Sequence, residues 1–172
     1  MNQNPQQAID FGAFVRDAQG RYQTARPVAD DDVIELARQI LDARVRKVDV
    51  MDSPGVASVY VMAKLAGHKS EVFSVLWLDN RHRVIAFEEM FNGTIDGCSV
   101  HPREVVRRAL ELNAAACMLA HNHPSGVAEP SMADVQITRK LKESLALIDV
   151  RVIDHLIVGG AEVTSMAERG QV

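Results

Sequence analysis

The sequence predicts an α/β fold in which helices flank a mixed β-sheet. One observation is that segments with apolar residues at helical spacing interleave with short runs of β-branched and aromatic residues. A second is that these segments follow no strict β-α-β rhythm, which favours a sheet with both parallel and antiparallel neighbours. The 172 residues suffice for one ordinary domain with an appendage and are too few for two full domains.

Residues 1–30 are polar and are expected to form an N-terminal arm, either a small hairpin or a loosely held segment. The turn-like run Asp17-Ala18-Gln19-Gly20 lies between two short apolar stretches. Three acidic residues, Asp30-Asp31-Asp32, then open a stretch with a 3.6-residue apolar period, which predicts a helix. We therefore assign residues 31–52 as a helical lead-in and residues 53–172 as the main domain.

The main domain is expected to alternate helices with short strands. Ser53-Pro54 and His101-Pro102 each put proline at a first helical position, which marks two helix starts. Ser131 opens a further helix. Strands rich in β-branched or aromatic residues are expected over residues 71–78, 84–91, 150–158 and 162–166, and a short apolar run of strand length over residues 114–120.

Composition and charge narrow the class of protein. No run approaches the ~20 apolar residues of a membrane span, and the start of the chain lacks the regions of a signal peptide, so we expect a cytoplasmic protein. Cys98 and Cys117 belong to no paired motif and are expected to be reduced thiols. The net charge of -4 gives no general attraction to nucleic acid. A basic cluster of Arg103, Arg107 and Arg108 is interpreted as a solvated helix face.

Most of the candidate catalytic and metal-binding residues lie in residues 120–134. Residues i and i+2 of a strand face the same side, so His121 and His123 can reach one ion while Asn122 points away. Asp134 can supply a third ligand if the strand end and the next helix start converge. Two histidines, one carboxylate and an open position form the arrangement of a catalytic zinc site.

Other roles compete for some of these residues. Ser131 and Asp134 form a Ser-x-x-Asp helix capping box, and a carboxylate wholly used in a cap cannot also face a metal. The sequence leaves that choice open. His155 lies in an apolar strand and is interpreted as a hydrogen-bonded structural residue, with support of a metal ligand as the alternative.

The spacing of these residues is similar to the His-x-His-x7-Ser-x2-Asp signature of the JAB/MPN-plus (JAMM) metalloproteases. The context resembles the bacterial RadC group more closely still, over residues 53–160. This resemblance implies a JAB/MPN domain with a cytidine-deaminase-like architecture. The segments that carry it are Phe91-Asn92-Gly93-Thr94-Ile95, His101-Pro102-Arg103-Glu104, Leu112-Asn113-Ala114-Ala115-Ala116, His121-Asn122-His123-Pro124-Ser125-Gly126 and Asp154-His155-Leu156-Ile157-Val158-Gly159.

The resemblance also implies a mechanism and its residues. In a JAMM hydrolase, three ligands bind Zn²⁺ and an upstream glutamate activates the zinc-bound water to cleave a peptide or isopeptide amide. The family pattern Glu-x-x-Phe-x-Gly-Thr selects Glu88 over its neighbour Glu89 as that glutamate. Ser131 would stabilise the oxyanion. The implied metal ligands are His121, His123 and Asp134.

The alternative function is a zinc-stabilised protein- or DNA-binding module with a DNA-repair-associated or mobile-element role. The RadC proteins that this chain resembles carry an N-terminal helix-hairpin-helix segment of the DNA-repair type. This chain is expected to be too short to hold that segment, so it resembles the short stand-alone members. This difference weakens the case for a nucleic-acid partner. A protein or peptide substrate is the expected partner, and the sequence specifies neither its identity nor the oligomeric state.

Overall fold

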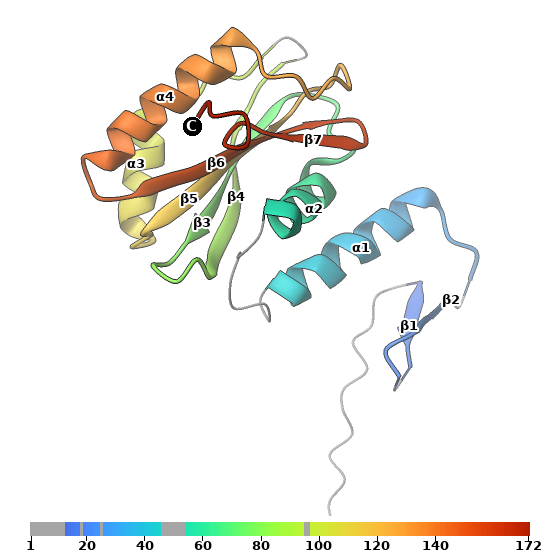
Figure 1. Cartoon of the computed structure of the whole chain (residues 1–172). Helices are drawn as coiled ribbons and strands as arrows, with labels where there is room; N and C mark the ends of the chain where they lie inside the picture. Colours follow the sequence, from blue (N-terminus) through green and yellow to red (C-terminus); the bar gives the residue numbers. More distant parts are fainter. Residues whose placement is uncertain (1–12, 18, 25, 46–53, 95–96) are drawn as a thin grey trace, which may run out of the picture.

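A computed structural model describes residues 13–17, 19–24, 26–45, 54–94 and 97–172, and a mixed β-sheet lies at its centre (Figure 1). Its strands are β3 (Val72–Leu78), β4 (Val84–Asn92), β5 (Ala116–Asn122), β6 (Arg151–Gly159) and β7 (Glu162–Ser165). In the order β4-β3-β5-β6-β7, the β5–β6 pair is parallel and the other neighbours are antiparallel. The predicted α/β fold with a mixed sheet is therefore confirmed.

Helices cover both faces of this sheet. They are α2 (Pro54–Leu65) on one face and α3 (Pro102–Glu111) and α4 (Met132–Ala146) on the other (Figure 1). Tyr60 and Leu65 of α2 pack against one set of alternate strand residues, while Val105 and Leu141 pack against the other set. Alternation of strand side chains thus builds two cores. The two helices predicted to begin at proline do begin at Pro54 and Pro102.

A small unit precedes the main domain. It consists of β1 (Phe14–Arg16), β2 (Tyr22–Thr24) and α1 (Asp30–Val45), with Phe14 and Leu36 at the centre of its apolar contacts. Arg38 of α1 donates hydrogen bonds to the carbonyls of Ala63 and Ala66, which joins this unit to α2 and the turn after it. Residues 1–12 of the expected arm and 46–52 of the expected lead-in lie outside the described residues. The division into arm, lead-in and main domain stays a prediction.

Strand β5 runs further than predicted. Its pairing with β3 places Phe73 opposite His121, and its pairing with β6 continues to Asn122. The backbone N–H of His123 then bonds the Val158 carbonyl at 2.8 Å. The strand continues past the apolar run because β3 and β6 supply hydrogen-bond partners for its backbone groups. The apolar run in the sequence does not indicate these partners. None of the described helices is long and apolar enough to cross a membrane.

Candidate metal centre

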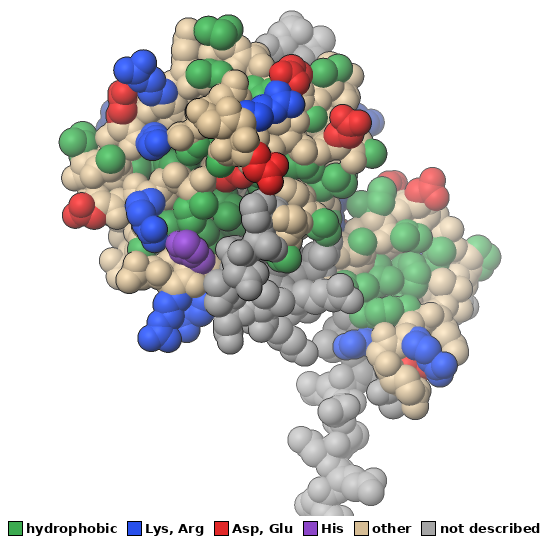
Figure 2. All heavy atoms as spheres, in the orientation of Figure 1, with side chains coloured by type: hydrophobic (Ala, Val, Ile, Leu, Met, Phe, Trp, Pro, Cys, Tyr) green, Lys and Arg blue, Asp and Glu red, His purple; other side chains and the backbone are tan. Residues whose placement is uncertain are grey.

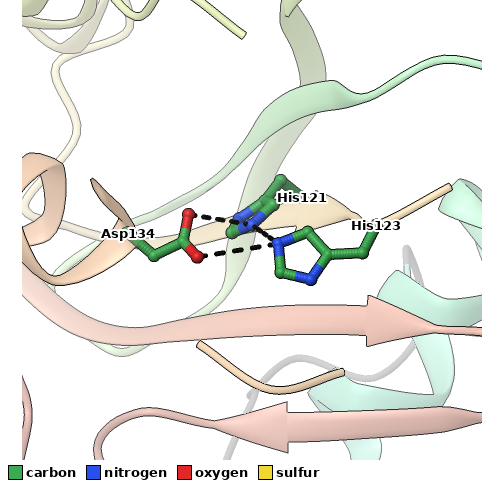
Figure 3. A group of neighbouring side chains, drawn as sticks. All are labelled: His121, His123 and Asp134. Carbon is green, nitrogen blue, oxygen red and sulfur yellow. Dashed lines mark hydrogen bonds and ion pairs between the residues drawn. The ribbon is translucent and has the colours of Figure 1, made fainter. Parts of the chain in front are cut away.

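Three side chains converge where β5 ends and α4 begins (Figure 3). His121 Nε2 lies 2.9 Å from His123 Nε2 and 3.1 Å from Asp134 Oδ1, and His123 Nε2 lies 3.6 Å from Asp134 Oδ2. Zinc bonds of ~2.1 Å in a tetrahedron place neighbouring ligand atoms about 3.4 Å apart. The three side chains therefore fit a single ion of this size, and nitrogen and oxygen donors of these kinds are among those that bind zinc.

The orientation of His123 is fixed by the loop that follows it. Its Nδ1 lies 2.8 Å from the Val127 carbonyl oxygen. Because a carbonyl can only accept, Nδ1 carries the proton and Nε2 is directed at Asp134. The Asp134 carboxylate raises the pKa of His123, burial opposes this, and the negative charge of Glu71 adds to the increase.

Asp134 serves the helix cap and the cluster together. Its Oδ2 accepts from the Ser131 backbone N–H and hydroxyl, each at 2.6 Å, while Oδ1 faces His121. The Ser131 hydroxyl in turn accepts from the Asp134 backbone N–H, which completes the capping box. The one carboxylate therefore fills both roles that compete in the sequence, since Oδ2 holds the cap and also lies 3.6 Å from His123 Nε2. Burial opposes ionisation of Asp134, but contacts with both histidines hold its pKa well below the usual range, so it is a carboxylate.

A cleft of about 400 Å³ opens beside the cluster. His123, Ser131 and Asp134 lie on its wall, and Glu71 is the other acidic side chain among the described lining residues. The same described lining contains no lysine or arginine. Its apolar wall is formed by Phe73, Cys98, Val100, Pro124, Ala133 and Ile137.

A family model described as "RadC-like JAB domain" matches residues 51–171. The chain belongs to this family. It is 60% identical over 137 residues to a "UPF0758 protein" of Nitrosococcus oceani, covering 80% of this chain and 61% of that protein. A "UPF0758 protein" of Marinobacter nauticus is 53% identical over 147 residues, covering 86% of this chain and 66% of the relative. The chain thus spans less than two thirds of the length of these relatives.

In this RadC-like JAB domain, Glu71 immediately precedes β3 and is held in place by the residue between the two histidines. The Asn122 side-chain Oδ1 accepts from the Val72 backbone N–H at 2.8 Å, and its Nδ2 donates to the Ser70 carbonyl at 3.0 Å. Asn122 therefore points away from the cluster, as predicted, and fixes the peptide groups on both sides of Glu71.

The structure does not bring Glu88 to the histidine cluster. Its carboxylate accepts from Arg108 of α3 at 2.5 Å and from the Trp77 indole at 3.0 Å. The Arg108 guanidinium lowers the pKa of Glu88, against the effect of burial. The physical reason is register, because Glu88 pairs with Val75 whereas His121 lies opposite Phe73. Glu88 is absent from the described lining of the cleft.

The remaining predicted residues have other surroundings. Glu89 forms a contact of 3.3 Å with His68. Both cysteines are free, and burial raises the pKa of Cys117 to about 12. Burial also raises the pKa of Cys98, despite an opposing contact with the Phe73 backbone. Neither environment favours a nucleophilic thiolate.

The sequence did not indicate that Glu71 lies on the cleft beside the histidine cluster. Glu71 belongs to no local motif with the histidines, which lie on a strand distant in sequence. The sequence shows only that Glu71 is the first residue of an apolar strand segment. That position places Glu71 near the histidines only once β3 is known to pair with β5.

Proposed function

We propose that this RadC-like JAB domain is a zinc-dependent hydrolase that cleaves a peptide or isopeptide amide. The observation that carries the proposal is the convergence of two imidazole nitrogens and a carboxylate oxygen on one point at the wall of an open cleft. His121, His123 and Asp134 would hold the ion. Bound zinc would supply a water of lowered pKa and polarise the scissile carbonyl.

We assign the general-base role to Glu71 instead of Glu88. Glu71 lies on the cleft that His123 and Asp134 also line, and the bonds of Asn122 fix its backbone. Its carboxylate would take a proton from the attacking water and deliver it to the leaving amine. Glu88 is a poorer base for this site because its carboxylate already accepts from Arg108 and Trp77.

Ser131 is the proposed oxyanion donor. Its hydroxyl borders the cleft and is fixed at the N-terminus of α4, where the backbone N–H groups add positive potential. The hydroxyl donates to Asp134 in the resting arrangement, so it would turn toward the carbonyl oxygen as negative charge develops there.

The charges around the cleft favour a neutral amide over a phosphodiester. No lysine or arginine is among its described lining residues. On α3, Arg107 is paired with Glu104 and Glu111, and Arg108 with Glu88 and Glu111, so these arginines do not present an uncompensated basic surface. Charged side chains of both signs are interspersed on the face of the main domain in Figure 2. A protein or peptide substrate therefore fits better than nucleic acid.

To test this, a peptide library is incubated with the zinc-loaded protein, its Glu71→Gln variant or its Glu88→Gln variant, and the cleavage products are identified by mass spectrometry. We expect zinc near one per chain, cleavage by the unchanged protein and by Glu88→Gln, and a loss of at least ~100-fold in Glu71→Gln. A folded protein that binds no zinc, or cleavage that survives Glu71→Gln, would overturn the proposal.

A further inference from the structure

A buried chain of hydrogen bonds leads from the backbone of α4 to the metal ligand His121. The Thr138 hydroxyl lies 2.5 Å from the Asp134 carbonyl oxygen and 2.6 Å from His155 Nδ1. On the other side of that ring, His155 Nε2 lies 2.9 Å from His121 Nδ1. Thr138 and His155 are each 0% exposed, so water does not compete for these bonds.

Which group donates in each of these hydrogen bonds follows from the bond between Thr138 and the Asp134 carbonyl. The Asp134 carbonyl can only accept, so the single Thr138 hydroxyl proton is donated to it. The Thr138 oxygen is then an acceptor, and His155 must donate to it from Nδ1–H. A neutral imidazole protonated on Nδ1 accepts through Nε2, which requires a proton on His121 Nδ1.

The consequence falls on the other nitrogen of His121. With its proton on Nδ1, a neutral His121 has a lone pair on Nε2, which is the atom that faces His123 and Asp134. The opposite tautomer would place a proton where the metal binds. We propose that Thr138 and His155 are positioning residues that hold His121 in the Nδ1–H tautomer and so prepare its Nε2 for the metal.

The fold supplies the means to aim His155 at α4. The register between β5 and β6 shifts by one residue, because Cys117 pairs with Val152 and Met118 with Asp154. This bulge reverses the alternation of β6 side chains and turns His155 toward the α4 face. Asp154 fixes the bulged strand by accepting from the His155 backbone N–H at 2.7 Å and from the Ser165 hydroxyl at 2.6 Å.

Packing fixes both rings as well. Phe73 stacks on His121 with ring centres 6.2 Å apart and meets His155 edge-on at 5.6 Å. Phe73 of β3 therefore packs against both imidazole rings and fixes the geometry of the hydrogen bond between them. The inference rests on the metal centre of the proposed hydrolase, but it does not require that the protein cleave any substrate.

The test compares Thr138→Val, which removes the hydroxyl at nearly constant shape, with Thr138→Ser, which keeps it. Long-range proton–nitrogen NMR of ¹⁵N-histidine-labelled, metal-free protein reads the tautomer of His121 directly. We expect Nδ1–H in the unchanged protein and in Thr138→Ser, and a mixture with Nε2–H in Thr138→Val. In competition with a chromophoric chelator, zinc affinity is expected to fall ~10–100-fold in Thr138→Val only.

Two results would overturn the inference. One is an unchanged protein in which His121 carries its proton on Nε2 alone, a measurement that needs no variant to fold. The other is a folded Thr138→Val variant with the original tautomer and undiminished zinc affinity. Zinc binding and Nδ1–H without peptide cleavage would contradict the proposed hydrolase and leave the inference standing, so the two failures are distinguishable.

Discussion

The side-chain amide of Asn122 spans Glu71, accepting from the backbone N–H of Val72 and donating to the carbonyl of Ser70. The amide thereby replaces the backbone pairing that a longer β3 would have made with β5. Because Asn122 stands between two proposed metal ligands, one short segment fixes both these histidines and the proposed base. This arrangement predicts that the base can be disturbed without loss of the metal site.

Replacing Asn122 by alanine removes both bonds and leaves two backbone groups without their partner. We expect a loss of roughly 2 kcal/mol in the free energy of unfolding, at ~1 kcal/mol per bond. Peptide cleavage should fall by at least ~10-fold, while zinc affinity changes little. Denaturant unfolding, chelator competition and cleavage rates measure the three quantities, and a selective loss of zinc binding would contradict the assignment.

Zinc should stabilise the folded protein through the three ligands. At a free zinc concentration of one hundred times Kd, the gain in unfolding free energy is ~2.7 kcal/mol. Asp134→Asn should abolish this gain, because the ligand charge is lost. Thermal unfolding with zinc and with a chelator checks the effect, and Glu143→Gln on the exposed side of α4 is the control that should respond like the unchanged protein.

The ion pair between Glu88 and Arg108 predicts a dependence of stability on pH. The pKa of Glu88 is lowered in the folded protein from the ordinary 4.5, so the stabilisation is fully present above that value and is lost as pH falls through the folded pKa. Glu88→Gln should cost roughly 1–2 kcal/mol at neutral pH and progressively less in acid.

Unfolding free energies measured across that pH range test the sign of this effect. Glu104→Gln, which affects the more exposed pair with Arg107, serves as the control and should cost clearly less than Glu88→Gln, because solvent screens an exposed pair. A Glu88→Gln deficit that grows on acidification would show that this pair does not account for the lowered pKa.

The role of Ser131 in the cap of α4 and its proposed role in catalysis can be tested separately. Ser131→Ala removes the cap of α4 and is expected to cost ~1 kcal/mol in stability. Cleavage should fall by ~10²–10³-fold if the hydroxyl also meets the oxyanion. Ser131→Thr keeps the hydroxyl and should retain most of both properties. Equal activity of the alanine and threonine variants would remove Ser131 from the mechanism.

Gly159 is required by a close approach of two backbones. A Cβ at this position would lie 2.3 Å from the Ala128 nitrogen and 2.5 Å from the Val127 carbonyl carbon. Gly159→Ala should therefore displace the loop that orients His123, lowering stability by ~1–3 kcal/mol and weakening zinc binding. Gly55→Ala meets nothing within 4 Å and is the matched control. Unfolding curves and chelator competition measure the stability and zinc affinity of both variants. A Gly159→Ala protein as stable and as tightly zinc-binding as Gly55→Ala would contradict the prediction.

Local spacing predicted that His121, His123 and Asp134 come together, because the two histidines depend only on strand alternation and Asp134 on the start of the next helix. It could not show that one Asp134 carboxylate serves the cap and the cluster together, since that depends on the position of β5 relative to α4. Glu71 was missed for a related reason. Its place beside the histidines is a product of the β3–β5 register and the Asn122 side chain.

Glu88 illustrates the limit of a local motif. Strand alternation separates Glu88 from Glu89 correctly, because the two make contacts with different partners, Arg108 and His68. Alternation gives the face of the sheet on which a residue lies, but not its position along the strand relative to His121. The register of β4 on β3 sets that distance, and it emerges only when the whole sheet is assembled.

The most direct measurement is anomalous diffraction at the zinc edge from crystals of the zinc-loaded protein. The account predicts one peak bonded to His121 Nε2, His123 Nε2 and an Asp134 carboxylate oxygen, with the Glu71 carboxylate facing the fourth position. A peak elsewhere, a fourth position closed by a protein ligand, or Glu88 in place of Glu71 would contradict it.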